Sequence, residues 1–183
     1  MTVKKQGSGN VTESEDFKKN VKLAIKGDKE AFSRLYALMY KDLYHTAYYS
    51  LRNEHDVADV VSETVLDAFS SIKKLRSEEA FKAWIFKILS AKIKRKQSEY
   101  ANTPSDITEP EYENTLARGF EFEHVELAQA MNSIEDTDRL ILSLSVLCGY
   151  TGEEIASVCG MNPSTVRSRL MRTKEKLKNY IDA

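Results

Sequence analysis

The sequence predicts an all-α protein in which a flexible linker joins two small helical domains. Apolar residues recur at helical spacing along most of the chain, and strand-like alternation persists nowhere. Glycine and proline rarely interrupt this pattern, because only 7 and 3 of them occur among 183 residues. One acidic stretch that contains two prolines has no sustained periodicity, which is typical of a linker. We therefore expect a disordered tail at 1–10, a first domain at 11–100, a linker at 101–120 and a second domain at 121–183.

Four helices are expected in the first domain. The capping-box pattern of Thr12 with Glu15 opens the first helix, and Gly27 ends it before the second begins. Apolar residues spaced three and four apart then make each helix amphipathic, with its apolar stripe facing a shared core. The second, third and fourth helices are predicted at about 29–51, 56–72 and 79–98.

The second domain is expected to contain a helix-turn-helix over residues 151–170. Gly160 allows a sharp turn because glycine has no Cβ to obstruct it. Asn162 is a good N-cap, and Pro163 suits the first position of a helix, where its missing N–H costs nothing. Val166 can face the preceding helix, which leaves the polar and basic residues around it for DNA.

The sequence gives no indication of catalysis. Its three histidines, at positions 45, 55 and 124, are scattered, and it contains no glycine-rich phosphate loop and no zinc-binding spacing. We therefore expect no enzyme, with no catalytic residue, no metal and no cofactor. Cys148 and Cys159 lie in apolar helical contexts and are expected to be free thiols. Without a signal-peptide pattern or a membrane-length apolar run, the chain is expected to be cytoplasmic and not inserted in a membrane.

The net charge of −1 hides an uneven distribution of charge. Cations gather at 73–96 and at 167–178, whereas the third helix carries an acidic stripe of Asp59, Glu63 and Asp67. Such a stripe is either a solvated face or a docking surface for a basic partner. The fourth helix joins aromatic residues to a basic surface, so its rings either belong to the core or stack on single-stranded bases.

Five motifs, taken in order, resemble those of one family. The segments GDKEAF (27–32), HDVADVVSET (55–64) and FKAWIFKI (81–88) resemble sigma region 2. The segments YTGEEIA (150–156) and TVRSRL (165–170) resemble sigma region 4. From Gly27 to Ile181 the chain therefore resembles an extracytoplasmic-function (ECF) sigma factor, a compact member of the sigma-70 family of bacterial RNA polymerase.

The resemblance implies a role for each half of the chain. The third helix would dock on the clamp of core RNA polymerase, through Asp56, Asp59 and Glu63. The following loop would hold a flipped −10 base, with Leu75, Arg76 and Ser77, and the fourth helix would contact phosphates, with Lys87, Lys94 and Arg95. The last helix would read base edges of the −35 element, with Ser164, Thr165, Arg167 and Ser168, and contact its backbone, with Arg169, Arg172 and Lys174.

The implied function is that of a promoter-specificity subunit. It would bind the clamp and flap regions of core polymerase, recognise promoter DNA at −35 and −10, and promote strand opening, under the control of a cognate anti-sigma factor. The sequence departs from the family pattern at Ser62, where glutamine is usual, and at Ala91, where asparagine is common. The run from Lys92 to Lys96 is also more basic than usual, so the −10 preference is open.

Two other classes remain open from the residues alone. A dimeric helix-turn-helix regulator would bind a palindrome tightly without polymerase, although the basic aromatic helix and the linker argue against it. A protein-interaction decoy would bind a regulator of sigma factors and no DNA, and would not support transcription.

Overall fold

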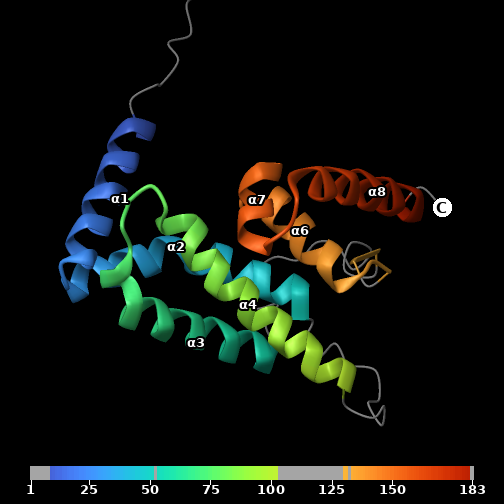
Figure 1. The fold of residues 1–183 in the computed structure, drawn as a ribbon, viewed down its shortest axis with the longest axis horizontal. Coiled ribbons are helices and arrows are strands. Elements are labelled where there is room, and N and C mark those ends of the chain that lie inside the picture. Colours follow the sequence, from blue (N-terminus) through green and yellow to red (C-terminus); the bar gives the residue numbers. More distant parts are fainter. Residues whose placement is uncertain (1–8, 52, 103–129, 132, 182–183) are drawn as a thin grey trace, which may run out of the picture.

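A computed structural model describes residues 9–51, 53–102, 130–131 and 133–181 of the chain. Every regular element among them is a helix, which confirms the predicted all-α fold (Figure 1). In chain order the helices are α1 (Gly9–Ile25), α2 (Lys29–Leu51), α3 (Glu54–Ser71), the 3₁₀ turn η1 (Ile72–Lys74), α4 (Phe81–Asn102), α6 (Asp136–Val146), α7 (Gly152–Cys159) and α8 (Pro163–Ile181). No helix within these ranges is long and apolar enough to cross a membrane.

The first half is a bundle of α1 to α4 around a largely apolar core. Gly27 ends α1 with a φ of 100°, a conformation that glycine adopts without steric cost. The Asp28 carboxylate then accepts a 2.9 Å hydrogen bond from the Ala31 amide at the start of α2. Asn53 caps α3 in the same way, at 3.2 Å from the Asp56 amide. The core of the bundle is made by fully buried side chains, among them Leu35, Leu43, Val57, Ile85 and Leu89.

The second half contains the predicted helix-turn-helix as α7, a turn and α8. Thr151 and Glu154 form a reciprocal capping box at the start of α7. Gly160 takes the left-handed conformation that ends α7 and turns the chain. Asn162 accepts a 2.9 Å hydrogen bond from the Ser164 amide, which fixes the start of α8. The turn at Gly160 and the cap at Asn162 are those predicted from the sequence, whereas the capping box of α7 is an additional feature of the structure.

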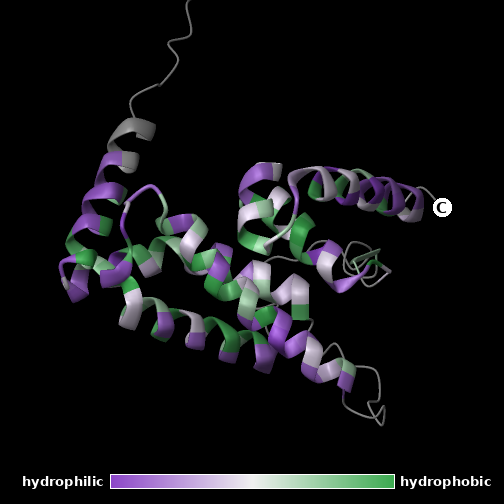
Figure 2. Cartoon of the chain, in the orientation of Figure 1, coloured by the Kyte–Doolittle hydropathy of each residue, from purple (hydrophilic) through white to green (hydrophobic). Residues whose placement is uncertain are grey.

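The two halves pack against each other. Helix α2 contacts α6, and α4 contacts α7, so one continuous apolar cluster runs through both halves (Figure 1). Phe86 of α4 meets the Tyr150 ring edge to face at 5.3 Å between centroids. Thr46 of α2 lies 3.4 Å from the Cys148 sulfur. Figure 2 shows hydrophobic residues gathered where α2, α4 and α6 meet, whereas α8 is largely hydrophilic.

The predicted linker is described only at its start. Helix α4 continues to Asn102, so its last two residues fall inside the stretch predicted as linker from residue 101. Residues 103–129 lie outside the described part of the chain. The predicted domain boundaries therefore stay predictions.

Candidate nucleic-acid interface

The first turns of α8 present a polar surface to solvent. Val166 is fully buried against α7, which turns its neighbours Thr165 and Arg167 outward. Ser164 and Ser168 are also exposed, and the Ser168 hydroxyl donates to the Ser164 carbonyl at 3.0 Å. The four residues predicted to read base edges thus lie on the exposed face of one helix end. The helix can enter a major groove with that face first.

The remaining basic residues of α8 differ in how firmly they are held. Arg169 is bound within the fold, because its guanidinium lies 2.7 Å from Asp138 and 3.4 Å from Glu135. Arg172 is exposed, and within the described part of the chain its guanidinium bonds only to the Ser168 carbonyl of its own helix. Lys174 is exposed and has no partner among the described residues. Arg169 therefore ties α8 to α6, while Arg172 and Lys174 are available for phosphates.

One face of α4 is bound to the acidic residues of α3. Lys92 lies 2.7 Å from Asp67 and 3.1 Å from Glu63, and its side chain is only 12% exposed. Arg95 also reaches Glu63, at 2.8 Å, and Lys96 reaches Asp56 at 2.9 Å. We call these six residues the charge ladder. It joins α3 to α4 along one side of the bundle.

The ladder lowers the pKa values of two carboxyl groups, those of Asp56 and Glu63. Burial on its own raises the pKa of Asp56, but hydrogen bonds from Tyr100 and Lys96 outweigh it and bring the pKa below its usual value. The hydrogen bond from Lys92 lowers the pKa of Glu63, and Arg95 adds to that effect. Both carboxyl groups are therefore charged at neutral pH.

The opposite face of α4 meets the second half of the chain. The Lys94 ammonium donates a 2.7 Å hydrogen bond to the Cys159 carbonyl at the C-terminal end of α7. A cation at this position interacts favourably with the helix dipole. Lys87 is exposed and has no partner among the described residues. Of the three predicted phosphate contacts on α4, one is thus free and two are held within the fold.

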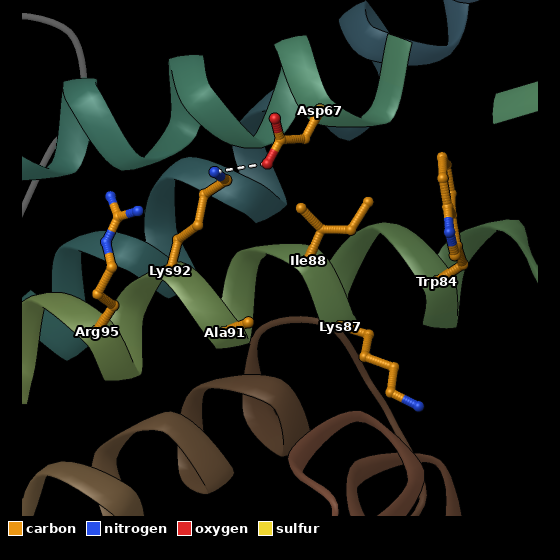
Figure 3. A pocket seen from close by; sticks show the side chains of 7 residues that line it. All are labelled: Asp67, Trp84, Lys87, Ile88, Ala91, Lys92 and Arg95. Atoms are coloured by element: carbon orange, nitrogen blue, oxygen red, sulfur yellow. Dashed lines mark ion pairs between the residues drawn. The ribbon is translucent and has the colours of Figure 1, made fainter. Parts of the chain in front are cut away.

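A groove runs between α3 and α4 beside the charge ladder. Its volume is about 520 Å³. The lining residues are Asp67, Trp84, Lys87, Ile88, Ala91, Lys92 and Arg95. Figure 3 shows Lys92 reaching toward Asp67, with Trp84 further along α4 and Lys87 pointing the other way. An aromatic ring with cations around it suits a stacked base and its phosphates. The sequence places aromatic and basic residues on one helix, whereas their position beside a groove follows from the packing of α4 against α3.

The loop predicted to hold a −10 base is tied to α1. Leu75 is half-buried and Arg76 is exposed. The Ser77 hydroxyl donates to Glu79 at 2.7 Å, and Lys18 of α1 reaches the same carboxylate at 3.3 Å. The hydrogen bond from Ser77 is the main reason that the pKa of Glu79 falls to about 2. The Glu79 carboxylate therefore links Ser77 of the loop to Lys18 of α1, while the Arg76 side chain stays exposed.

The three residues predicted to dock on polymerase differ in their exposure. Asp59 is exposed and pairs with His55 of its own helix at 3.3 Å. Asp56 and Glu63 are instead shared with the charge ladder. His55, Asp56 and Asp59 bring ligand-type atoms within 4.8 Å of one another. The Lys96 ammonium already forms an ion pair with the Asp56 carboxylate, and a neighbouring cation disfavours a bound metal ion.

Comparison with known proteins identifies the family. The sequence matches sigma-70 region 2 over residues 35–99 and sigma-70 region 4 over residues 124–177, which together exceed half of the chain. The chain belongs to the sigma-70 family, in its ECF group. The RNA polymerase sigma factor SigV of Bacillus subtilis is 28% identical over 143 residues, covering 75% of this chain and 83% of SigV. The ECF sigma-E factor of Escherichia coli K12 is 28% identical over 171 residues, covering 85% and 89%.

Solved structures share the fold. CnrH, in complex with the cytosolic domain of CnrY, superposes with a TM-score of 0.71 at 24% identity, covering 91% of this chain and 97% of that one. The sigma factor RpoE of Bartonella quintana, in complex with the anti-sigma factor NepR, gives 0.69 at 19% identity, covering 83% and 97%.

The family assignment gives the two halves their names. The region 2 match contains α3 with most of α2 and α4, and the region 4 match contains α6 and α7 with most of α8. The ECF sigma factor is a promoter-specificity subunit that acts in transcription initiation. This identity favours the sigma class over the dimeric regulator and the decoy.

Proposed function

We propose that the chain docks on core RNA polymerase through α3, reads −35 DNA with α8, and holds unstacked −10 bases with α4 and the loop before it. The observation that carries this proposal is the exposed face of α8, with Ser164, Thr165 and Arg167, on a chain that also carries region 2. No chemical step is needed. Captured single-stranded bases offset the unstacking cost of a few kcal/mol, so opening is driven by binding and the chain needs no catalytic group.

Binding both promoter elements would require the two halves to separate. The positions −35 and −10 are about 25 base pairs apart, which is roughly 85 Å at about 3.4 Å per base pair. Residues 103–129 connect α4 to the second half, and such a length spans at most about 95 Å when extended. The reach is sufficient only if region 4 leaves its place on α2 and α4. The packed arrangement is then the resting form of the free chain.

An anti-sigma factor is the expected regulator. Both CnrH and RpoE, whose folds are similar, were solved in complexes, one with the cytosolic domain of CnrY and the other with the anti-sigma factor NepR. A cognate partner of this kind would bind the chain in the cytoplasm and hold it away from polymerase.

The first experiment is in vitro transcription. The purified chain is added to sigma-free bacterial core polymerase on a library of promoter fragments, and every start site is mapped. Start sites that share one −35 and −10 pair are the expected result. Absence of transcripts, while the same core is active with a control sigma factor, would contradict the proposal. Tight binding of the free chain to a palindrome would then support the dimeric regulator.

Docking through α3 is tested by charge reversal. Asp59→Lys should weaken binding to core polymerase, because Asp59 is exposed and has no partner on α4 among the described residues. Glu153→Lys on α7 is the matched control, since it reverses an exposed charge away from α3. Equal affinity of both variants for core polymerase would show that the acidic stripe is a solvated face and not a docking surface.

A further inference from the structure

Two cations on one flank of α8 are bound to the start of α6 and to the turn before it. Arg169 lies 2.7 Å from the Asp138 carboxylate and 3.4 Å from that of Glu135. Two helical turns further on, the Lys176 ammonium donates a hydrogen bond to the Ser133 carbonyl. Positions seven residues apart fall on nearly the same side of a helix, so the two cations form one row. We call Arg169 and Lys176 the tether of α8.

The partners of the tether are themselves firmly anchored. Asp138 belongs to the first turn of α6, where a carboxylate interacts favourably with the helix dipole, and its side chain is only 19% exposed. The turn before α6 is fixed by Arg139, which is fully buried. Its guanidinium donates to the carbonyls of Met131 and Ile134, at 3.3 Å and 2.5 Å. The tether therefore attaches α8 to a well-anchored part of region 4.

Apolar packing alone does not set the rotation of α8. Val166 and Leu177 are buried on its inner side, and apolar contacts of this kind have no preferred direction. An ion pair on one flank opposes rotation of the helix about its axis, because turning the helix would separate the charges. Thr165 is exposed one turn before Arg169, so any rotation also moves the predicted base-reading side chains. A binding site needs its side chains placed within about 0.5 Å.

We propose that Arg169 is a positioning residue for −35 recognition: its ion pair with Asp138 holds α8 at the rotation that the base-reading residues need, and it does not bind a phosphate. This inference rests on the proposed function, because it needs α8 to read −35 DNA. It replaces the backbone contact that the family resemblance implies for Arg169. A phosphate would have to displace a carboxylate that is already bound, whereas Arg172 is exposed and meets no such competitor among the described residues.

The test compares two arginines of the same helix. Arg169→Gln removes the paired guanidinium, and Arg172→Gln removes an exposed one three residues further on. The probes are two short, fluorescently labelled duplexes, one with the −35 element shared by the mapped start sites and one with the same bases in scrambled order. Anisotropy titrations of the full chain measure its affinity for each duplex at several salt concentrations. Thermal unfolding of each variant confirms that it is folded.

The two variants should differ in specificity and in salt dependence. Arg169→Gln should bind the −35 duplex about two- to five-fold more weakly than the wild-type chain does, as expected for a partly exposed ion pair, and the scrambled duplex equally well. Its slope of log K against log salt should stay that of the wild-type chain, because no phosphate contact is lost. Arg172→Gln should weaken binding to both duplexes alike and reduce that slope by about 0.9. The same uniform loss and reduced slope in Arg169→Gln would overturn the proposal.

Asp138→Asn distinguishes positioning from a phosphate contact by the sign of its effect. If Arg169 bound a phosphate, loss of the competing carboxylate would strengthen binding to both duplexes. If Arg169 positions α8, the same loss should weaken binding to the −35 duplex alone, as Arg169→Gln does. The double variant should then bind no more weakly than either single variant, because the two residues act as a pair. Tighter binding by Asp138→Asn, or losses that add in the double variant, would overturn the proposal.

The wild-type chain separates this inference from the proposed function. Equal affinity of the wild-type chain for the two duplexes would contradict the reading of −35 DNA by α8 itself. Discrimination by the wild-type chain that persists unchanged in Arg169→Gln and Asp138→Asn would contradict only the positioning role.

Discussion

The two helices predicted to bind DNA differ in how the fold treats their cations. On α4, the four cations between positions 92 and 96 all have partners within the fold. Lys92, Arg95 and Lys96 pair with acids of α3, and Lys94 donates to a carbonyl of α7. On α8, Arg169 alone forms ion pairs with other helices, while Arg167 and Lys174 have no partner in the described part of the chain. The basic run 92–96 of α4 is therefore engaged within the fold, whereas Lys87 of α4 and most cations of α8 are exposed.

This difference predicts which of the two DNA contacts depends on polymerase. An exposed cation releases counterions on meeting phosphate, and this gain drives much of the binding to DNA. A cation that already has a carboxylate partner gains less, because it must first lose that partner. We therefore expect the free chain to bind duplex −35 DNA without polymerase, and to bind the −10 strand well only as part of the holoenzyme.

The largest effect is expected at Arg167. Arg167→Ala should weaken binding of the free chain to duplex −35 DNA by about 1–3 kcal/mol if the side chain binds a guanine edge in two places. Titration of labelled duplex by fluorescence anisotropy measures this loss. Lys178→Ala is the control, because it removes an exposed cation from the far end of the same helix. An equal loss on scrambled duplex would make Arg167 a phosphate contact.

A second prediction concerns Cys148, which lies where the two halves meet. Burial raises the pKa of the Cys148 thiol from 9.0 to about 11, and Cys148 faces Thr46 across the two halves. Because the thiolate is the reactive form, alkylation of Cys148 near pH 8 should be roughly 100-fold slower than for an ordinary thiol. Peptide mass spectrometry after timed alkylation gives the rate at each cysteine.

Opening of the two halves should reverse this protection. Cys148 should react faster in the holoenzyme on promoter DNA than in the free chain, because α6 then leaves α2. Since the thiol pKa is higher in the folded chain, its contribution to the packed form is complete below pH 9 and is lost as pH rises through about 11. Fast alkylation of the free chain at pH 8 would show that the halves are already apart.

Local signals in the sequence predicted the helices but not the pairing of charges. Gly160 and Asn162 act on residues within four positions of themselves, so their effect follows from sequence alone. Glu63 and Arg95 are 32 residues apart, and their contact depends on how α3 crosses α4. The run from Lys92 to Lys96 was therefore predicted as one basic surface, although helical spacing already separates Lys94 from its neighbours.

The packing of the halves was also beyond sequence reasoning. Ile155 and Val158 lie on one side of α7, and local periodicity can identify them as its apolar stripe. That this stripe shares one core with Phe86 and Leu89 of region 2 depends on contacts across about 70 residues. Amphipathic patterns show which face is buried, and they leave open what buries it.

The smallest expected effect is also the most direct test of whether the two regions act as one unit. Each half has a cap that can be removed without touching the core: Asn53 at the start of α3 and Thr151 at the start of α7. Asn53→Ala and Thr151→Ala should each lower the free energy of unfolding by about 1 kcal/mol. For a chain of this size that loss lowers Tm by about 2–4 °C.

The form of the transition distinguishes the two arrangements. With one continuous core, both variants should shift a single calorimetric transition by similar amounts, because every helix unfolds with its neighbours. Two transitions, of which Thr151→Ala moves one and Asn53→Ala the other, would mean that the halves fold independently in the free chain. In that case Lys94 would be free of the Cys159 carbonyl, and α4 would differ from α8 only through the charge ladder.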